Sequence, residues 1–568
     1  MAKSYLWIII AVTAVLLASP IYAVDSSRVN VLDFGAKADS ITDDTSAFNA
    51  AFDAVKAKAG TVFVPAGRYM IKTNLSVPAN VTLEGISVYP AVGVTGSVLL
   101  AVAGAGSEEG PGFVSLSTNS TLKGITIYYP EQKPENLQPY PWCISGAGDN
   151  IAIIDCMLVN PYNGIDLGRN PCGRHLVRNV YGNPLRRGLF VDQCYDVGRI
   201  ENVHFWPFWN TGGWTPAQGG KIGEVMTGQG EAFIFARTDW EYVTNTFSWG
   251  YKVGYHFATS QHGGMNGNLL GIGADATEIA VLIDNCNSIG LLITNGEFVS
   301  FAGKNPIEVV VKDTNSGVVQ FQNCAFWGPA AQVAKIEGTG TVSFNNCNFV
   351  EWDAQRQNKP GIEVFGGSLL VNGCNFHYEL SPQISLRDKA QAAVVVGNRM
   401  AGPLRVMNSA NADLQIGLNI QGKKPVRPKE EAGAIVVDDV DGAPNVKFTG
   451  GWQTAAGDVY YFKGTRWASK DSGEAKAIFT PNVPKTGMYT AYAWYGPDTF
   501  NDHAGKAPVI IKSLDGLTTR HVDQRLTKEQ WVKLGVFRFE KGRKGSITMT
   551  NGADANVLAD AVKLVPSK

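Results

Sequence analysis

A short motif of the form Asn–Cys–x–Phe recurs along the middle of the chain and constrains its fold more than any other feature. Three clear copies begin at Asn323, Asn346 and Gly373. Weaker copies begin at Asp155, Asn179, Asn202, Asn245 and Asn295. Most neighbouring copies lie roughly 23–28 residues apart, a period typical of repeat architectures. Because each repeat is rich in Val, Ile and Phe and is bounded by Gly and Asn, it predicts strands. Strands stacked one coil upon the next form a β-solenoid, whose long flank suits an extended polymer.

The charge and the first residues of the chain limit its partners and its location. A formal net charge of −1 and the lack of a basic stripe argue against nucleic acid. Residues 1–23 have the pattern of an export signal, with Lys3 before an apolar stretch and a small residue, Ala23, at the cleavage site. A retained membrane anchor is the alternative. We therefore expect a secreted or periplasmic protein without a membrane contact beyond the signal; the oligomeric state is left open.

The eight cysteines do not form the pattern of a disulfide framework or a metal site. Cys324, Cys347 and Cys374 occupy the same phase of successive repeats, so we expect them to stack inside the solenoid as small apolar residues. Neither a CxxC pair nor clustered His accompanies them, so no metal is predicted. Whether one disulfide joins two of the residues Cys143, Cys156, Cys172 and Cys194 is left open by the sequence.

The repeat pattern divides the chain into an all-β solenoid and a second all-β unit. An amphipathic segment with Phe48, Phe52 and Val55 at helical spacing predicts a helix that caps the first coil. The parallel β-helix is expected over 24–420, followed by a charged, Pro-containing linker over 421–433. Residues 434–568 lose the coil period and show short alternating strands, which predict a β-sandwich.

The first part of the solenoid carries a recognisable opening. It contains Asp33-Phe34-Gly35-Ala36, Thr42-Asp43-Asp44-Thr45 and the strand–turn–strand run from Gly60 to Tyr69. These pieces resemble the pectate-lyase-like superfamily, which includes rhamnogalacturonases and related epimerases. The resemblance implies a right-handed parallel β-helix that acts on polysaccharides. Hydrolases, lyases, epimerases and phage tailspikes share this fold, so the reaction has to be argued from the site.

The second unit carries a different set of matching pieces. They are Gly451-Trp452, Tyr492-Ala493-Trp494-Tyr495, Trp531-Val532-Lys533-Leu534-Gly535 and Ala559-Asp560-Ala561-Val562. The unit is similar to the golvesin or xanthan-lyase carbohydrate-binding-like module. Such modules accompany secreted polysaccharide-active enzymes, so the resemblance implies a context more than a mechanism.

Strand alternation predicts which side chains point out of the solenoid and are available for catalysis. Aligned coils place a set of apolar residues inward: Ile165, Leu167, Leu189, Val191, Phe233, Phe235, Tyr255 and Phe257. The outward positions carry Asp166, Phe190, Asp192 and His256. Asp166 and Asp192 lie on adjacent coils with backbones roughly 8 Å apart, which suits the acid and base of an inverting glycosidase. The alternative is that both carboxylates stabilise turns. Asp196 is a further candidate carboxylate.

A lyase is the second interpretation of the same region. It needs a base near the α-proton of a uronate and a cation that stabilises the developing charge, functions that Arg237 and His256 can supply. Arg187 is a candidate contact for a substrate carboxylate. The sequence lacks the Asn-Thr-Asp, Asp-Asp and Gly-His-Gly series of polygalacturonases, which argues against that activity.

An unusually long interval between Asn202 and Asn245 holds an aromatic segment. Trp206, Trp209 and Trp214 lie in it, and exposed aromatic rings are typical of a binding surface. We expect them to bind sugar; the alternative is that the segment packs on itself.

Together these patterns predict a secreted, polysaccharide-degrading enzyme whose partner is an extracellular polysaccharide. Glycoside hydrolysis is the first hypothesis and β-elimination by a polysaccharide lyase the second. A non-catalytic carbohydrate-binding or tailspike-like surface protein is the third. No cofactor is predicted, and Ca²⁺ stays open for a lyase.

Overall fold

The structure is a computed structural model that describes residues 27–567 except 88–93, 134, 211–215, 379, 423–426, 456–459, 463, 497–501 and 527–529. The predicted signal at 1–23 and Trp214 lie outside these residues. Among the helices that are described, none has both the length and the apolar character needed to span a bilayer.

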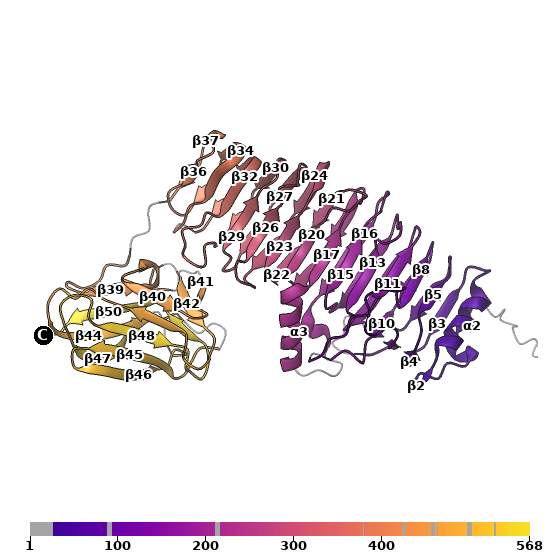
Figure 1. Ribbon diagram of the computed structural model, residues 1–568, viewed down its shortest axis with the longest axis horizontal. Helices are drawn as coiled ribbons and strands as arrows, with labels where there is room; N and C mark the ends of the chain where they lie inside the picture. Colours follow the sequence, from indigo (N-terminus) through magenta and orange to yellow (C-terminus); the bar gives the residue numbers. More distant parts are fainter. Residues whose placement is uncertain are drawn as a thin grey trace, which may run out of the picture.

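A solenoid of parallel strands forms the first and larger part of the protein (Figure 1). It begins with β1 (Arg28–Asn30) and ends with β38 (Ile420–Gln421). The strands stack in three faces. The site face, which carries most of the predicted site residues, contains β8 (Val114–Ser117), β11 (Trp142–Ala147), β13 (Asn163–Leu167), β15 (Arg187–Val191), β17 (Glu231–Phe235), β20 (Val253–Phe257), β23 (Ile279–Ile283), β26 (Ile307–Val311) and β29 (Gln332–Ile336).

The other two faces continue the same coils. The second contains β14 (Leu176–Gly182), β16 (Arg199–Phe205), β18 (Glu241–Thr244), β21 (Met265–Leu270), β24 (Cys286–Thr294), β27 (Val318–Gln322) and β30 (Thr341–Asn345). The third contains β19 (Phe247–Trp249), β22 (Gly273–Thr277), β25 (Glu297–Ser300), β28 (Ala325–Trp327), β31 (Asn348–Phe349), β33 (Asn375–Phe376) and β35 (Arg399–Met400). The predicted parallel β-solenoid is confirmed.

The recurrent motif forms the corner between the second and third faces. Its first residue lies in the left-handed region, with φ of 55° at Asn323 and 53° at Asn346, a conformation that Asn tolerates better than most residues. The Asn323 side-chain amide donates to the side-chain Oδ1 of Asn295 at 2.7 Å, so these corners are joined from coil to coil. The motif's Phe326 stacks on Phe349, with ring centroids 5.4 Å apart.

The interior of the solenoid is apolar, as the alternation predicts. All eight residues assigned inward on the site face are fully buried. Phe233 stacks on Tyr255 of the next coil with ring centroids 4.9 Å apart. The cysteines of the motif are buried among these residues, and all eight cysteines are free. Stacking of like side chains therefore fixes the register between coils.

Helices are few and lie outside the strand stack. Helix α2 (Thr45–Val55) lies at the N-terminal end of the solenoid and buries Phe48, Phe52 and Val55 (Figure 1). That it shields the first coil from solvent stays a prediction. The long aromatic segment contains η2 (Pro207–Asn210) and α3 (Pro216–Gln229), which pack against each other.

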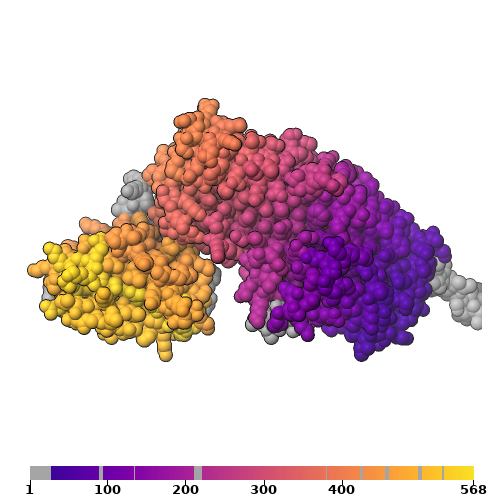
Figure 2. All heavy atoms as spheres, in the orientation of Figure 1, coloured from indigo at the N-terminus to yellow at the C-terminus, as the bar shows by residue number. Residues whose placement is uncertain are grey.

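The C-terminal part consists of antiparallel sheets around a separate apolar core. One sheet contains β39 (Ile435–Asp438), β50 (Ala561–Pro566), β44 (Gly487–Trp494) and β47 (Val532–Phe539). Another contains β40 (Val446–Thr449), β43 (Lys476–Phe479), β48 (Ser546–Thr550), β45 (Ala507–Ser513) and β46 (Gly516–Val522). A small third sheet contains β41 (Gln453–Ala455), β42 (Thr465–Ala468) and β49 (Val557–Ala559). Figure 2 shows this part as a lobe beside the last coils of the solenoid.

Candidate active site

Asp166, the first predicted catalytic carboxylate, is tied into the turn that follows β13. It is 1% exposed, and its Oδ1 accepts hydrogen bonds from the backbone amides of Gly168 and Arg169, both at 3.0 Å. Its Oδ2 forms an ion pair with the Arg169 side chain. Arg169 itself borders a hollow of about 380 Å³ on the site face. These are the contacts of a carboxylate that stabilises a turn and orients an arginine.

Asp192, the second predicted catalytic carboxylate, joins the turns of three coils. Its Oδ1 accepts from the Gln193 amide at 2.8 Å, the Arg237 amide at 2.9 Å and the Ser260 hydroxyl at 3.0 Å. The residue is 5% exposed. The structure does not link it to Asp166 by a shared contact among the described residues. Asp192 therefore fixes where the neighbouring turns lie.

Asp196 lies at the exposed edge of the solenoid. It shares Arg174 with Asp149, and its distance to the Arg174 guanidinium is 2.9 Å. The hydrogen bond to Arg174 and the one to the amide of Val197 lower the pKa of its carboxyl. Asp196 has no contact with Asp166 or Asp192 among the described residues.

His256 lies on the site face between two carboxylates, an arrangement we call the histidine cluster: Glu231, His256 and Asp284. Strand pairing places His256 beside Ile234 of β17 and Leu282 of β23. Its Nδ1 is 3.0 Å from Glu231 Oε2, and its Nε2 is 3.0 Å from Asp284 Oδ2.

The two carboxylates determine the charge of this imidazole. Burial lowers the pKa of His256, but the hydrogen bonds and charges of Asp284 and Glu231 outweigh it and raise the pKa to about 9. Despite the burial of Glu231, the same contacts lower the pKa of both carboxyls. At neutral pH the cluster is an imidazolium between two carboxylates. The His256 imidazolium can donate a proton but cannot accept one.

Arg237 belongs to a second group, which we call the arginine cluster: Tyr195, Arg237 and His262. A parallel bridge pairs Cys194 with Thr238, so the segments that carry Tyr195 and Arg237 run next to each other. The Arg237 guanidinium carbon is 5.5 Å from the centroid of the Tyr195 ring. The Tyr195 hydroxyl is 3.4 Å from His262 Nδ1, and the ring is 54% exposed.

One nitrogen of Arg237 is left without a partner. Its Nη1 is buried and makes no hydrogen bond to any described residue. A guanidinium with an unused donor is suited to a carboxylate, which it can bind through charge-assisted hydrogen bonds. The arginine cluster thus combines an anion-binding cation with a phenol and an imidazole that can move protons.

Asp192 also organises this cluster. Its carboxylate accepts from the Arg237 amide and from the Ser260 hydroxyl. The Ser260 Oγ in turn accepts from the His262 amide at 3.0 Å. The carboxylate thus fixes the backbone that carries both the arginine and the histidine.

The aromatic segment packs on the wall of the solenoid rather than standing free. The Trp209 ring lies 5.2 Å from Tyr181, 5.3 Å from His204 and 5.2 Å from Trp206, measured between ring centroids. Burial under these rings lowers the pKa of His204 to about 4. The contacts favour the self-packed alternative for Trp206 and Trp209, while sugar binding by these rings is untested.

Arg187 lies on the site face near the histidine cluster. It is paired in register with Glu231, and its guanidinium carbon is 5.9 Å from the centroid of the Trp142 ring. Trp142 stacks on Phe190 at 6.3 Å. Arg187 therefore lies where it could contact the carboxylate of a substrate bound on the site face.

Four residues of the two clusters were not predicted as site residues: Tyr195, Glu231, His262 and Asp284. Extending the strand alignment to the coil of β23 would have identified Asp284, because it follows Leu282 as Asp192 follows Phe190. No local pattern marks Tyr195 or His262, since they meet only through turns of different coils.

Two segments of the chain match known family models. Residues 28–109 match the rhamnogalacturonase A/epimerase, pectate lyase-like model, and residues 435–566 match the golvesin C-terminal domain model.

Two curated proteins are similar over part of the chain. A xanthan lyase of Bacillus sp. (strain GL1) is 35% identical over 165 residues, which are 28% of this chain and 17% of that protein. Alginate lyase 7 of Azotobacter vinelandii is 58% identical over 43 residues, 7% of this chain and 5% of that protein. The chain therefore spans less than a fifth of either curated relative.

Among solved structures, a Paenibacillus xanthan lyase is similar at 31% identity and a TM-score of 0.23, over 24% of this chain and 13% of that one. The protein thus combines a β-solenoid that opens with a pectate-lyase-like segment and a C-terminal β-sandwich that matches the golvesin C-terminal domain.

Proposed function

We propose that this protein is a polysaccharide lyase that cleaves a uronate-containing extracellular polysaccharide by β-elimination at the arginine cluster. The observation that carries the proposal is that Arg237, whose buried Nη1 has no partner among the described residues, lies beside the exposed Tyr195 ring, which contacts the partly buried His262. The names of the two curated relatives, a xanthan lyase and an alginate lyase, support a lyase over a hydrolase.

β-Elimination requires three functions, and each residue of the arginine cluster can supply one of them. A base removes the proton at C5 of the uronate, the released electron pair forms the C4=C5 double bond, and the bond from C4 to the glycosidic oxygen breaks. Arg237 binds the uronate carboxylate and stabilises the charge that develops on it. The His262 imidazole takes the C5 proton, and the Tyr195 hydroxyl gives a proton to the leaving oxygen.

Asp192 acts in this proposal as a positioning residue. Its carboxylate holds the Arg237 backbone and, through Ser260, the His262 backbone. A hydrolytic function for Asp166 and Asp192 has less support, since Asp166 uses both oxygens on Gly168 and Arg169. We therefore favour the lyase alternative over the first hypothesis from the sequence, a glycoside hydrolase.

The test is a panel of uronate-containing polysaccharides that includes xanthan and alginate. Product is measured both as new reducing ends and as the ultraviolet absorbance of the unsaturated uronate. A lyase raises both signals, a hydrolase raises only the reducing ends, and a non-catalytic binder raises neither. Reducing ends without absorbance would overturn the proposal.

Variants locate the activity on the chain. Arg237→Gln and Tyr195→Phe are expected to lower kcat by about 10²–10⁴-fold while the melting temperature changes little. Arg174→Gln is the matched control, because Arg174 is an exposed, ion-paired arginine of the same coils. Equal rates in all three variants would place the chemistry elsewhere.

A further inference from the structure

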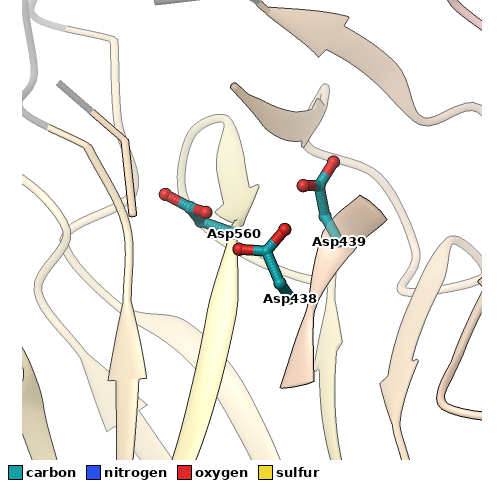
Figure 3. A group of neighbouring side chains, drawn as sticks. All are labelled: Asp438, Asp439 and Asp560. Atoms are coloured by element: carbon teal, nitrogen blue, oxygen red, sulfur yellow. The ribbon is translucent and has the colours of Figure 1, made fainter. Parts of the chain in front are cut away.

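Three buried carboxylates come together in the C-terminal sandwich, far from the arginine cluster. Asp438 ends β39, Asp439 begins η3 (Asp439–Asp441), and Asp560 precedes β50. The antiparallel pairing of β39 with β50 joins these segments. Figure 3 shows the three side chains lying side by side. One potential ligand atom from each lies within 4.8 Å of the others.

Asp438 and Asp560 each use one oxygen for the backbone and leave the other without a partner. Asp438 Oδ1 accepts from the Val440 amide at 3.2 Å, and Asp560 Oδ2 accepts from the Tyr461 amide at 3.0 Å. Asp438 Oδ2 and Asp560 Oδ1 are buried and have no hydrogen-bond partner among the described residues. The orientation of both carboxylates is thus fixed while one oxygen of each stays available.

Asp439 is the least satisfied member of the cluster. Its side chain is fully buried, and neither oxygen has a hydrogen bond within the described part of the chain. Arg356 Nη2 and Arg466 Nε lie 3.7 and 3.8 Å from its Oδ2, too far for hydrogen bonds. Its Oδ1 is left without either contact.

The arginines nearby do not balance the buried negative charge. Arg427, the third arginine near the cluster, forms an ion pair with Asp441 and lies 3.9 Å from Asp438. An unpaired buried carboxylate is costly, so such a group needs a positive partner or a proton.

We propose that Asp438, Asp439 and Asp560 form a binding site for a divalent cation, Ca²⁺, in the C-terminal sandwich. Hard oxygen ligands at about 2.4 Å suit Ca²⁺, and two such ligands on opposite sides of the ion are about 4.8 Å apart. The candidate ligand atoms of the cluster lie within this distance of one another. Mg²⁺ has shorter bonds of about 2.1 Å and demands a strict octahedral geometry, whereas Ca²⁺ accepts flexible sets of oxygen ligands, so Ca²⁺ is the ion we propose.

The ion would join elements that are separate in the chain. It binds the end of β39, the start of η3 and the residue before β50, which close one edge of the sandwich. Arg356 belongs to the solenoid and contacts Asp439, so the site lies where the two parts of the protein meet. Arg466 also lines a hollow of about 460 Å³ between the two parts.

The experiment uses the full chain, stripped with a chelator and then titrated with CaCl₂ or MgCl₂ by calorimetry and by thermal denaturation. We expect one saturable Ca²⁺ site, weaker binding of Mg²⁺, and a rise in the melting temperature of the sandwich by about 5 °C or more at saturation. Asp439→Asn and Asp560→Asn should each lower the Ca²⁺ affinity by at least about 10-fold. Asp515→Asn is the matched control, because Asp515 is an exposed carboxylate of the same sandwich.

Each outcome decides the proposal. No Ca²⁺ binding by the wild-type protein would overturn it and would mean that protons neutralise the cluster instead. Unchanged binding in both cluster variants would overturn it as well. Should the two variants fail to fold, the chelator and Ca²⁺ titration of the wild-type protein still decides, because a melting temperature that ignores the ion refutes the site.

Discussion

Replacing His256 with Gln should remove a pH-dependent part of the protein's stability. The folded pKa of about 9 lies above the usual 6.5, so protonated His256 stabilises the fold. Each pKa unit corresponds to about 1.36 kcal/mol, so the shift corresponds to roughly 3 kcal/mol. Because the folded pKa is raised, this stabilisation is complete below pH 6.5, decreases as the pH rises, and is lost above pH 9.

The carboxylates set the other end of this pH window. Glu231 and Asp284 have lowered pKa values, so their contribution is present above their ordinary values and is lost as the pH falls through the lowered ones. The charge of Arg187 also lowers the pKa of Glu231, and the charge of Lys312 lowers that of Asp284. The cluster should therefore stabilise the solenoid most in mildly acidic solution.

The measurement is the unfolding of the wild-type protein and of His256→Gln between pH 5.5 and 9.5, with His256 titrated directly by NMR of labelled imidazoles. The difference in the free energy of unfolding between the two proteins should be largest near pH 6 and should disappear toward pH 9.5. His377→Gln is the control, since His377 is an exposed histidine of the same solenoid. A gap that does not change with pH, or an NMR midpoint near 6.5, would refute the reasoning.

Three further predictions follow from contacts described above. Trp209→Ala should lower the stability by roughly 2–3 kcal/mol, less than for a fully buried ring, because it removes packing within the aromatic segment; an unchanged melting temperature with weaker polymer binding would favour the sugar-binding hypothesis. Asp192→Asn should lower both kcat and the melting temperature, since it loosens Arg237 and Ser260 together; a loss of kcat alone would indicate a catalytic group. All eight thiols should stay unreactive toward a thiol reagent until the protein unfolds, because every cysteine is free and buried; rapid labelling of the native protein would contradict this.

The repeat motif predicted the fold well because it records contacts between successive coils. The corners at Asn323 and Asn346 have a left-handed backbone, which favours Asn. Cys347 fills a small buried site, and Phe349 packs between the rings of the coils before and after it. These requirements recur at each coil, so they are visible in the sequence.

The site was harder to predict because its contacts do not repeat. Alternation assigns Asp166 and Asp192 to positions outside the row of inward residues, but it does not show that backbone amides bind their carboxylates. Likewise, the approach of Asp439 to Asp560 depends on β39 and β50, which are far apart in the sequence but pair in one sheet. Such contacts follow from the folded topology rather than from any local pattern.

The corners of the solenoid also determine how such a chain can change in length. A duplicated coil carries its own Asn corner, its own inward rings and a new row of backbone partners, so it can extend the solenoid without disturbing either neighbour. A single inserted residue within a strand instead reverses which side chains face inward beyond it. The length of the solenoid is therefore free to evolve in whole coils, while the spacing of side chains within each coil is held fixed.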